Sequence, residues 1–242
     1  MNKYRGVVYL VEAAILALFS AAPAVAQGAG SFSIYGKLSW EPTVSGVMHS
    51  GGQGQILGQP ATIDEKSWGD THSDGFRVEG GIGWGISDRL EAIANVNFGR
   101  AEADDLEIGS VAGLVTTATF DNYEYWGVEG GARYFFGEGG FKPYVAVVGG
   151  FRVVSEIGAV FSVPQLNVVI PSRFYSESTV ATFGTDVGVL FGGGRPKFGI
   201  EAGFRYAGGL RDDDSGLEGT GLEGINDDGS RWTFPIGFVL RF

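Results

Sequence analysis

The stretch RWTFPIGFVLRF, residues 231–242, alternates in character along its whole length. A period of two is the signature of a β-strand with one apolar face. Because a strand that ends a chain frays unless both its edges are paired, the stretch predicts the closing strand of a barrel. Every second residue is apolar, namely Trp232, Phe234, Ile236, Phe238, Leu240 and Phe242.

Seven earlier segments repeat this alternation, and each has about ten residues or more, the length of a tilted membrane-crossing strand. Short turns at one end and long loops at the other are typical of outer-membrane barrels. We therefore predict an all-β, eight-stranded antiparallel transmembrane up-and-down β-barrel with short periplasmic turns and long extracellular loops. The seven segments are residues 31–41, 75–86, 89–100, 123–136, 141–154, 178–191 and 197–210. The long connections are residues 42–74, 101–122, 155–177 and 211–230.

The two faces of these strands differ sharply. One face is apolar, whereas the other carries nearly every charge inside a strand and many glycines, such as Gly81 and Gly203. Charges and glycines suit a narrow polar interior, and the apolar face then requires lipid outside. The predicted lumen charge network is Lys37, Arg77, Glu79, Glu91, Glu129, Arg133, Arg152, Asp186, Glu201, Arg205 and Arg241.

Two interpretations of this network are open. Eight strands leave a lumen that side chains just fill, and six cations nearly balance five anions, which favours salt bridges that plug the barrel. The interior glycines favour the alternative, a narrow channel for small solutes, because they leave room for water. We favour the plug.

Aromatic residues gather near both ends of the predicted strands, on the apolar face. Amphipathic rings in membrane barrels rest at the level of the lipid headgroups. By the same reasoning, Phe242 lies in the membrane interface. The predicted interface girdle is Trp40, Trp84, Trp126, Trp232, Phe136, Phe191 and Phe198.

The first 26 residues have the pattern of a secretory signal peptide. A basic start is followed by the apolar run AAILALFSAAP and by Ala24-Val25-Ala26, an A-x-A cleavage site. We expect residues 1–26 to be removed, which leaves residues 27–242 as the barrel domain. Glu12 interrupts the upstream side of the leader and keeps an uncleaved anchor as the alternative.

The composition excludes several classes of function. The chain has no cysteine, so disulfides do not stabilise it, and its net charge of -11 excludes a basic face for nucleic acid. His49 and His72 are the only histidines, and each is adjacent to a serine, which on a strand points the opposite way. Without a cysteine nucleophile or a histidine cluster, we predict no enzyme, including a lipid A-modifying one, no metal site and no cofactor.

Two of the long connections carry further hypotheses. Residues 211–230 are acidic, which fits either a divalent-cation site or a solvated, mobile surface, and we favour the surface. Residues 155–177 are apolar and contain Pro164 and Pro171. They fit either a contact surface or a hairpin that extends the flanking strands beyond the bilayer.

Together with the aromatic-x-x-x-Phe ending, these features resemble the OmpA-like and OmpX-like outer-membrane barrel superfamily, which includes the opacity-type proteins and shades into the OmpW family. The resemblance covers the whole predicted mature chain. It implies that Phe238, Leu240 and Phe242 form the signal read by the barrel-assembly machinery.

The resemblance also sets expectations about location and role. It implies a monomer in the bacterial outer membrane, surrounded by lipids and lipopolysaccharide, with a structural or surface-interaction role. Residues 155–177 and 211–230 are then the candidate contacts for an extracellular partner. The alternative is an OmpW-like narrow channel for small hydrophobic or ionic solutes.

The sequence departs from the OmpA pattern in two respects. Because the sequence stops at Phe242, we expect the peptidoglycan-binding domain of full-length OmpA proteins to be absent. Pro235 lies within the last strand and cannot donate a ladder hydrogen bond, so we expect a bulge or a frayed end there.

Overall fold

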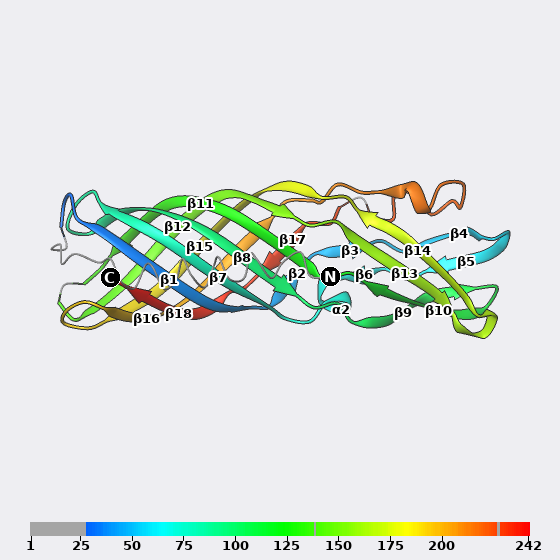
Figure 1. Ribbon diagram of the computed structural model, residues 1–242, viewed down its shortest axis with the longest axis horizontal. Helices are drawn as coiled ribbons and strands as arrows, with labels where there is room; N and C mark the ends of the chain where they lie inside the picture. Colours follow the sequence, from blue (N-terminus) through cyan, green and yellow to red (C-terminus); the bar gives the residue numbers. More distant parts are fainter. Residues whose placement is uncertain (1–27, 138, 227) are drawn as a thin grey trace, which may run out of the picture.

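Eight antiparallel strands close into a barrel in the computed structural model, which describes residues 28–137, 139–226 and 228–242. The predicted signal peptide therefore lies outside the described residues. Each strand pairs with its chain neighbours, and the last strand returns to the first, which confirms the predicted up-and-down barrel (Figure 1). The barrel strands are β1 (Phe32–Glu41), β7 (Gly75–Gly85), β8 (Leu90–Ala101), β11 (Tyr123–Phe135), β12 (Phe141–Val154), β15 (Ser178–Phe191), β16 (Lys197–Ala207) and β18 (Ile236–Arg241).

The alternation in sequence becomes alternation in burial. Along β16, buried residues such as Arg205 take turns with exposed ones such as Phe204. At the short-turn end, Ser87 holds its turn because its hydroxyl accepts a hydrogen bond from the main-chain nitrogen of Leu90 (3.1 Å). Period-two burial with tight turns is what an up-and-down barrel requires.

The closing strand is interrupted. Residues 231–242 form two strands, β17 (Arg231–Thr233) and β18, separated by Phe234 and Pro235. Pro235 lacks the N–H that a continuous ladder would need. Pairing continues past the break, because Phe234 N donates to Pro42 O (3.0 Å) and β17 pairs with β2 (Thr43–Ser45).

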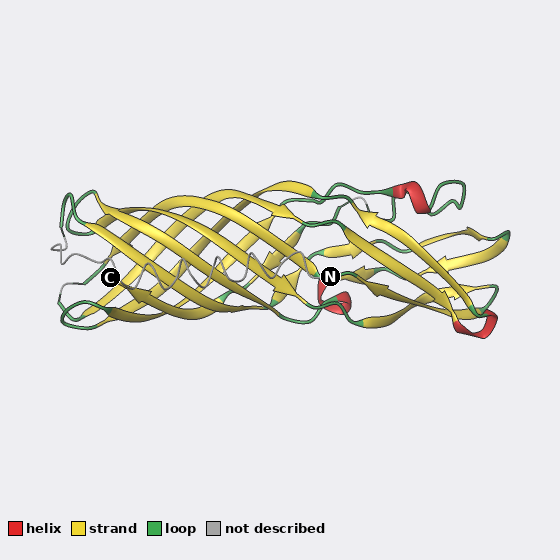
Figure 2. Cartoon of the chain, in the orientation of Figure 1, coloured by secondary structure: helices red, strands yellow, loops and turns green. Residues whose placement is uncertain are grey.

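The long connections fold into a second sheet beyond the barrel. The sequence predicted loops there and left a hairpin open for residues 155–177 alone, and that hairpin is confirmed by the antiparallel pairing of Ile157–Val163 with Val168–Tyr175. Figure 1 shows this sheet continuing the long axis of the barrel, and Figure 2 shows how much of it is strand. We call this part the extension, residues 43–74, 102–122, 155–177, 208–226 and 228–233. Its six-stranded sheet has the order β14-β13-β10-β9-β5-β4, and β3 pairs with β6 beside it. The strands are β3 (Val47–His49), β4 (Gly52–Ile56), β5 (Gln59–Ile63), β6 (Lys66–Ser67), β9 (Asp105–Val111), β10 (Leu114–Phe120), β13 (Ile157–Val163) and β14 (Val168–Tyr175).

Residues 211–230 join the two edges of this sheet. On one edge, Gln55 N donates to Thr220 O (2.7 Å), and on the other, Asp213 N donates to Phe174 O (3.1 Å). The prediction that this segment is a solvated surface loop was therefore wrong in part. Three of its side chains are buried in the hydrophobic core of the extension, namely Leu217, Leu222 and Ile225.

Helices are short. The helix α2 (Trp68–Thr71) begins with a capping box between Ser67 and Asp70. Two 3₁₀ turns, η1 (Pro164–Leu166) and η2 (Asp214–Gly216), lie in the extension. Among the described residues, no helix has the length and apolar character needed to cross a membrane.

Candidate functional site

The barrel lumen is the candidate site, because the charged side chains of all eight strands meet there. The structure buries every member of the predicted network. Their strands place them on the inward parity, opposite the exposed apolar residues. The eleven buried residues are Lys37, Arg77, Glu79, Glu91, Glu129, Arg133, Arg152, Asp186, Glu201, Arg205 and Arg241.

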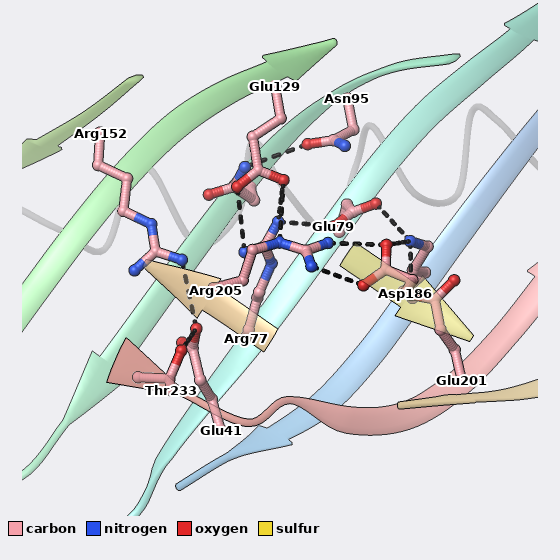
Figure 3. A network of polar contacts seen from close by, with 12 residues as sticks. Glu41, Arg77, Glu79, Asn95, Glu129, Arg152, Asp186, Glu201, Arg205 and Thr233 are labelled. Atoms are coloured by element: carbon pink, nitrogen blue, oxygen red, sulfur yellow. Dashed lines mark hydrogen bonds and ion pairs between the residues drawn. The ribbon is translucent and has the colours of Figure 1, made fainter. Parts of the chain in front are cut away.

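Lys37 is the centre of the network. Its ammonium lies 2.7 Å from Glu201, 2.9 Å from Glu79 and 3.9 Å from Asp186. Two guanidinium nitrogens of Arg205 donate to the two oxygens of the Asp186 carboxylate, at 2.6 and 2.8 Å (Figure 3). Bidentate, charge-assisted pairs of this kind are among the strongest hydrogen bonds in proteins.

A second arginine, Arg77, links this centre to Glu129 on β11. Arg77 lies 2.8 Å from Glu79 and 2.7 Å from Glu129 (Figure 3). Arg205 approaches the same Glu129 carboxylate at 3.4 Å. Glu79, Glu129 and Asp186 therefore each face two cations, which offsets the large cost of burying charge away from water.

The network continues toward the short-turn end of the barrel. Glu91 accepts from Arg241 (2.6 Å), Arg133 (3.1 Å) and the hydroxyl of Ser33 (2.8 Å). A cavity of about 20 Å³ lies beside Glu91 and Arg241, which is room for about one water molecule.

At the other end, the structure adds an acid that the sequence analysis missed. Glu41 lies 3.3 Å from Arg152 and accepts a hydrogen bond from Thr233 (2.9 Å) (Figure 3). It also accepts one from the hydroxyl of Tyr125 (2.6 Å). The signal was available, because Glu41 has the same parity as Lys37 on the first strand. With Glu41, the five predicted acids become six, and the same end also holds Arg231, a buried cation outside the predicted six.

Tyrosines fill the space between the charges. The guanidinium of Arg133 lies 4.9 Å from the ring centres of Tyr35 and Tyr144. Tyr144 donates to Glu201 (2.7 Å), and Arg152 lies 4.1 Å from the ring of Tyr125. These rings pair with the cations through their π-faces and fill the lumen between them.

Neighbouring side chains fill the space beside the lumenal glycines, so these glycines do not leave room for water. A Cβ on Gly81 would overlap the ring of Tyr35, and one on Gly188 would overlap that of Tyr144. A Cβ on Gly203 would overlap the Asp186 carboxylate. The interior glycines therefore accommodate the side chains of the plug, contrary to the interpretation that favoured a channel.

The extension covers the lumen. Trp68 from α2 packs on Tyr123, with ring centres 5.2 Å apart, and the guanidinium of Arg231 lies 4.6 Å from the same tyrosine. Both aromatic residues are buried and join the hydrophobic core of the extension. The polar lumen is thus capped by a hydrophobic layer on its long-loop side.

The residues considered for catalysis and metals have structural contacts. His49 packs against Phe174 (5.7 Å between ring centres), and its Nδ1 lies 3.3 Å from the Ser50 carbonyl. His72 contacts the Asp121 carbonyl through Nε2 (3.1 Å). In the acidic segment, Asp213 caps η2 by accepting from Ser215 N (3.2 Å). Across the described part of the chain, no group of three or more His, Cys, Asp or Glu is arranged to hold a metal.

The outer wall carries the predicted girdle and assembly signal. All seven girdle residues are exposed, as is Phe238, while Leu240 and Phe242 are half-buried. The main chain of Phe242 pairs with that of Ile34 in both directions (2.9 and 3.3 Å). The girdle residues are Trp40, Trp84, Trp126, Trp232, Phe136, Phe191 and Phe198.

Comparisons with known proteins gave similarity in structure alone. No protein-family model and no curated protein sequence matches this chain. The solved structures that are similar to it include the following three. The outer membrane protein OprG from Pseudomonas aeruginosa has 13% identity, coverage of 89% of this chain and 97% of that one, and a TM-score of 0.44. Neisserial surface protein A has 15% identity, coverage of 86% and 95%, and a TM-score of 0.39. Ail, the attachment invasion locus protein of Yersinia pestis, has 15% identity, coverage of 88% and 99%, and a TM-score of 0.38. The strand pairing of this chain itself establishes the closed eight-stranded barrel.

Proposed function

We propose that this protein is an outer-membrane β-barrel with a sealed lumen, which serves as a rigid platform for a folded structure at the cell surface. Its role is then structural or one of surface interaction. The observation that carries the proposal is the lumen, which is filled by paired charges and covered by the core of the extension.

The outer wall supports the membrane placement. Large apolar side chains are exposed all around the barrel, including Leu38, Val147, Val187 and Ile200. Soluble proteins rarely expose apolar patches above a few hundred Å². Exposed tryptophans near both ends of the strands fit two headgroup regions, and a closed barrel satisfies every main-chain group within lipid.

The extension supports the interaction role. Its strands continue the barrel, so its surface is held rigidly, which lowers the entropic cost of binding. Apolar side chains stand exposed on two of its hairpins, including Leu57, Leu166 and Val169. Within the predicted contact segments, we assign residues 155–177 the larger part, because their hairpin exposes the large apolar side chains of Leu166 and Val169.

Conductance in a planar bilayer tests the sealed lumen. Residues 27–242 are refolded, and a heat-modifiable gel shift verifies folding before insertion. We expect no discrete steps above baseline, because ion pairs and tyrosine rings fill the lumen at the level of Lys37. Reproducible steps whose size changes in Glu129→Gln would contradict the plug and favour the channel.

A further inference from the structure

Two glycines face outward side by side on the wall of the barrel. Gly36 on β1 and Gly80 on β7 are cross-strand partners, and both have the outward parity of Leu38 and Val78. A Cβ on Gly80 would meet nothing within 4 Å, and one on Gly36 would meet only Glu79 O at 3.9 Å. The space above these two residues is therefore open.

The missing side chains leave a groove of about 430 Å³, which we call the β1–β7 groove. Binding pockets for small molecules have volumes of roughly 300–1,000 Å³, so the groove has the size of a ligand site. Its walls are hydrocarbon and include Ile34, Leu38, Val78, Phe198, Phe238 and Leu240.

Neither charged side chain of the lining opens into the groove. Lys37 and Glu79 contribute to the lining, but their charged groups lie 2.9 Å apart and are both buried in the lumen. An occupant of the groove therefore meets methyl, methylene and phenyl groups. Only an aliphatic chain or an apolar side chain suits such a lining.

A cation stands at the short-turn end of the groove. The guanidinium of Arg195 donates to Phe32 O (3.4 Å) from the turn before β16. Phe32 lies two residues before Ile34, about 7 Å along the strand. A positive charge next to an apolar groove complements a molecule with an alkyl chain and an anionic phosphate.

We propose that the β1–β7 groove seats one acyl chain of a glycerophospholipid, with its phosphate directed toward Arg195. The inference rests on the proposed membrane placement, in which the short-turn end lies at the periplasmic leaflet. There the groove opens directly onto lipid chains, and the girdle residue Phe198 in its wall lies at headgroup level.

Native mass spectrometry tests the site. The refolded protein is released from nanodiscs of palmitoyl-oleoyl phosphatidylethanolamine and phosphatidylglycerol, and the fraction that carries one phospholipid is measured. The double variant Gly36→Leu/Gly80→Leu fills the groove. The matched control is Gly130→Leu, because Gly130 also faces outward in open space, with Ile93 O at 3.8 Å, and does not line the groove. Heat modifiability verifies that each variant folds.

We expect one retained phospholipid on the wild type and on the control. The fraction that carries the lipid should be about tenfold lower in the double variant, because the acyl chain then loses the burial of roughly two methylenes. Arg195→Gln lowers retention less, since it leaves the groove intact. Equal retention by all variants, or none by the wild type, overturns the proposal. An unchanged fraction in Arg195→Gln overturns its headgroup part.

Two further outcomes distinguish a lipid site from a dimer interface and from a channel. A lipid-free dimer that the double variant abolishes overturns the proposal and assigns the groove to a second copy of the chain. Conductance of the same preparation tests the sealed lumen separately. If the protein shows no conductance steps and retains no phospholipid, the lipid site is overturned and the sealed lumen stands. If it shows conductance steps and retains the phospholipid, the sealed lumen is overturned and the lipid site stands.

Discussion

At the scale of the residue, the lumen is a set of buried charges that depend on one another. Lys37 touches three carboxylates, and two of them also bind an arginine. A buried ion pair is not by itself stabilising, because desolvation can cost as much as the attraction gains. Removing one member is different, because its partners stay buried without compensation.

Lys37→Met provides the residue-scale prediction. Methionine has a similar length, but it leaves Glu79 and Glu201 without their shared cation. We expect the free energy of unfolding, measured by urea titration of the protein in lipid vesicles, to fall by about 3–5 kcal/mol.

The control is an ion pair on the surface. Arg173 lies 3.3 Å from Glu156, and the side chains are 64% and 49% exposed. Arg173→Met should cost less than about 1 kcal/mol, because water screens such pairs. Similar losses in the two variants would mean that water reaches the lumen and that the charges do not form a dry plug.

The sequence showed which residues face the lumen and which face outward, but it did not show which lumenal side chains form ion pairs with one another. Parity alone separates Lys37 and Glu129 from the apolar residues beside them. It does not show that Arg241 binds Glu91, 150 residues away, because that contact depends on strand stagger around the whole ring. Glu41 was missed because it stands at the very end of its strand, although its parity was inward.

At the scale of the element, the extension was the least predictable part. β10 (LVTTATF) and β13 (IGAVFSV) have strand-like residues, but they pair with each other across about 40 positions of the sequence, a separation that local pattern does not reveal. Residues 211–230 look solvated because acids dominate their composition, and Leu217 and Leu222 follow no regular period. Only tertiary packing shows that these leucines are core residues.

The pH response of α2 and its surroundings is the element-scale prediction. Burial, with a smaller contribution from the charge of Arg231, lowers the pKa of His72 from 6.5 to about 4. Between these values the unfolded extension binds a proton that the folded one does not, so stability is complete above pH 6.5 and falls as the pH drops toward 4. The loss amounts to about 3 kcal/mol.

Hydrogen exchange of residues 105–120 at pH 7 and about pH 4.5 measures this response, and exchange in β8 and β11 serves as the internal reference. We expect protection of the extension to fall in acid, after correction for the intrinsic rate. His72→Gln should reduce the pH dependence of this protection only in part, because burial also lowers the pKa of His49. An unchanged pH dependence in the variant would show that His72 does not cause the response.

At the scale of the whole molecule, two sheets enclose two different cores, and the long-loop ends of barrel strands reach the second core through residues such as Tyr123 and Val154. The barrel is polar inside and apolar outside, whereas the extension has an apolar core centred on aromatic rings. The sequence predicted the first arrangement because lipid-facing alternation is long and regular. The second depends on contacts among all four connections, which no single segment encodes.

Phe174→Ala tests whether these two parts are stable independently. The ring of Phe174 is buried between Phe120 (5.4 Å), Tyr175 (5.3 Å) and His49 (5.7 Å). A phenylalanine-to-alanine change in a core costs about 3–5 kcal/mol. We expect a protease to cleave the extension of the variant roughly 100-fold faster than that of the wild type, because cleavage follows the population of the opened form.

The barrel of this variant should stay folded. Its lumen is held by its own ion pairs, from Arg241 with Glu91 to Arg152 with Glu41, and none of them involves Phe174. The heat-modifiable gel shift should therefore persist after digestion, and Val169→Ala, at a position 62% exposed, should resist the protease like the wild type. If the gel shift is lost together with the extension, the hydrophobic cap is required to close the barrel, and the molecule folds as one cooperative unit.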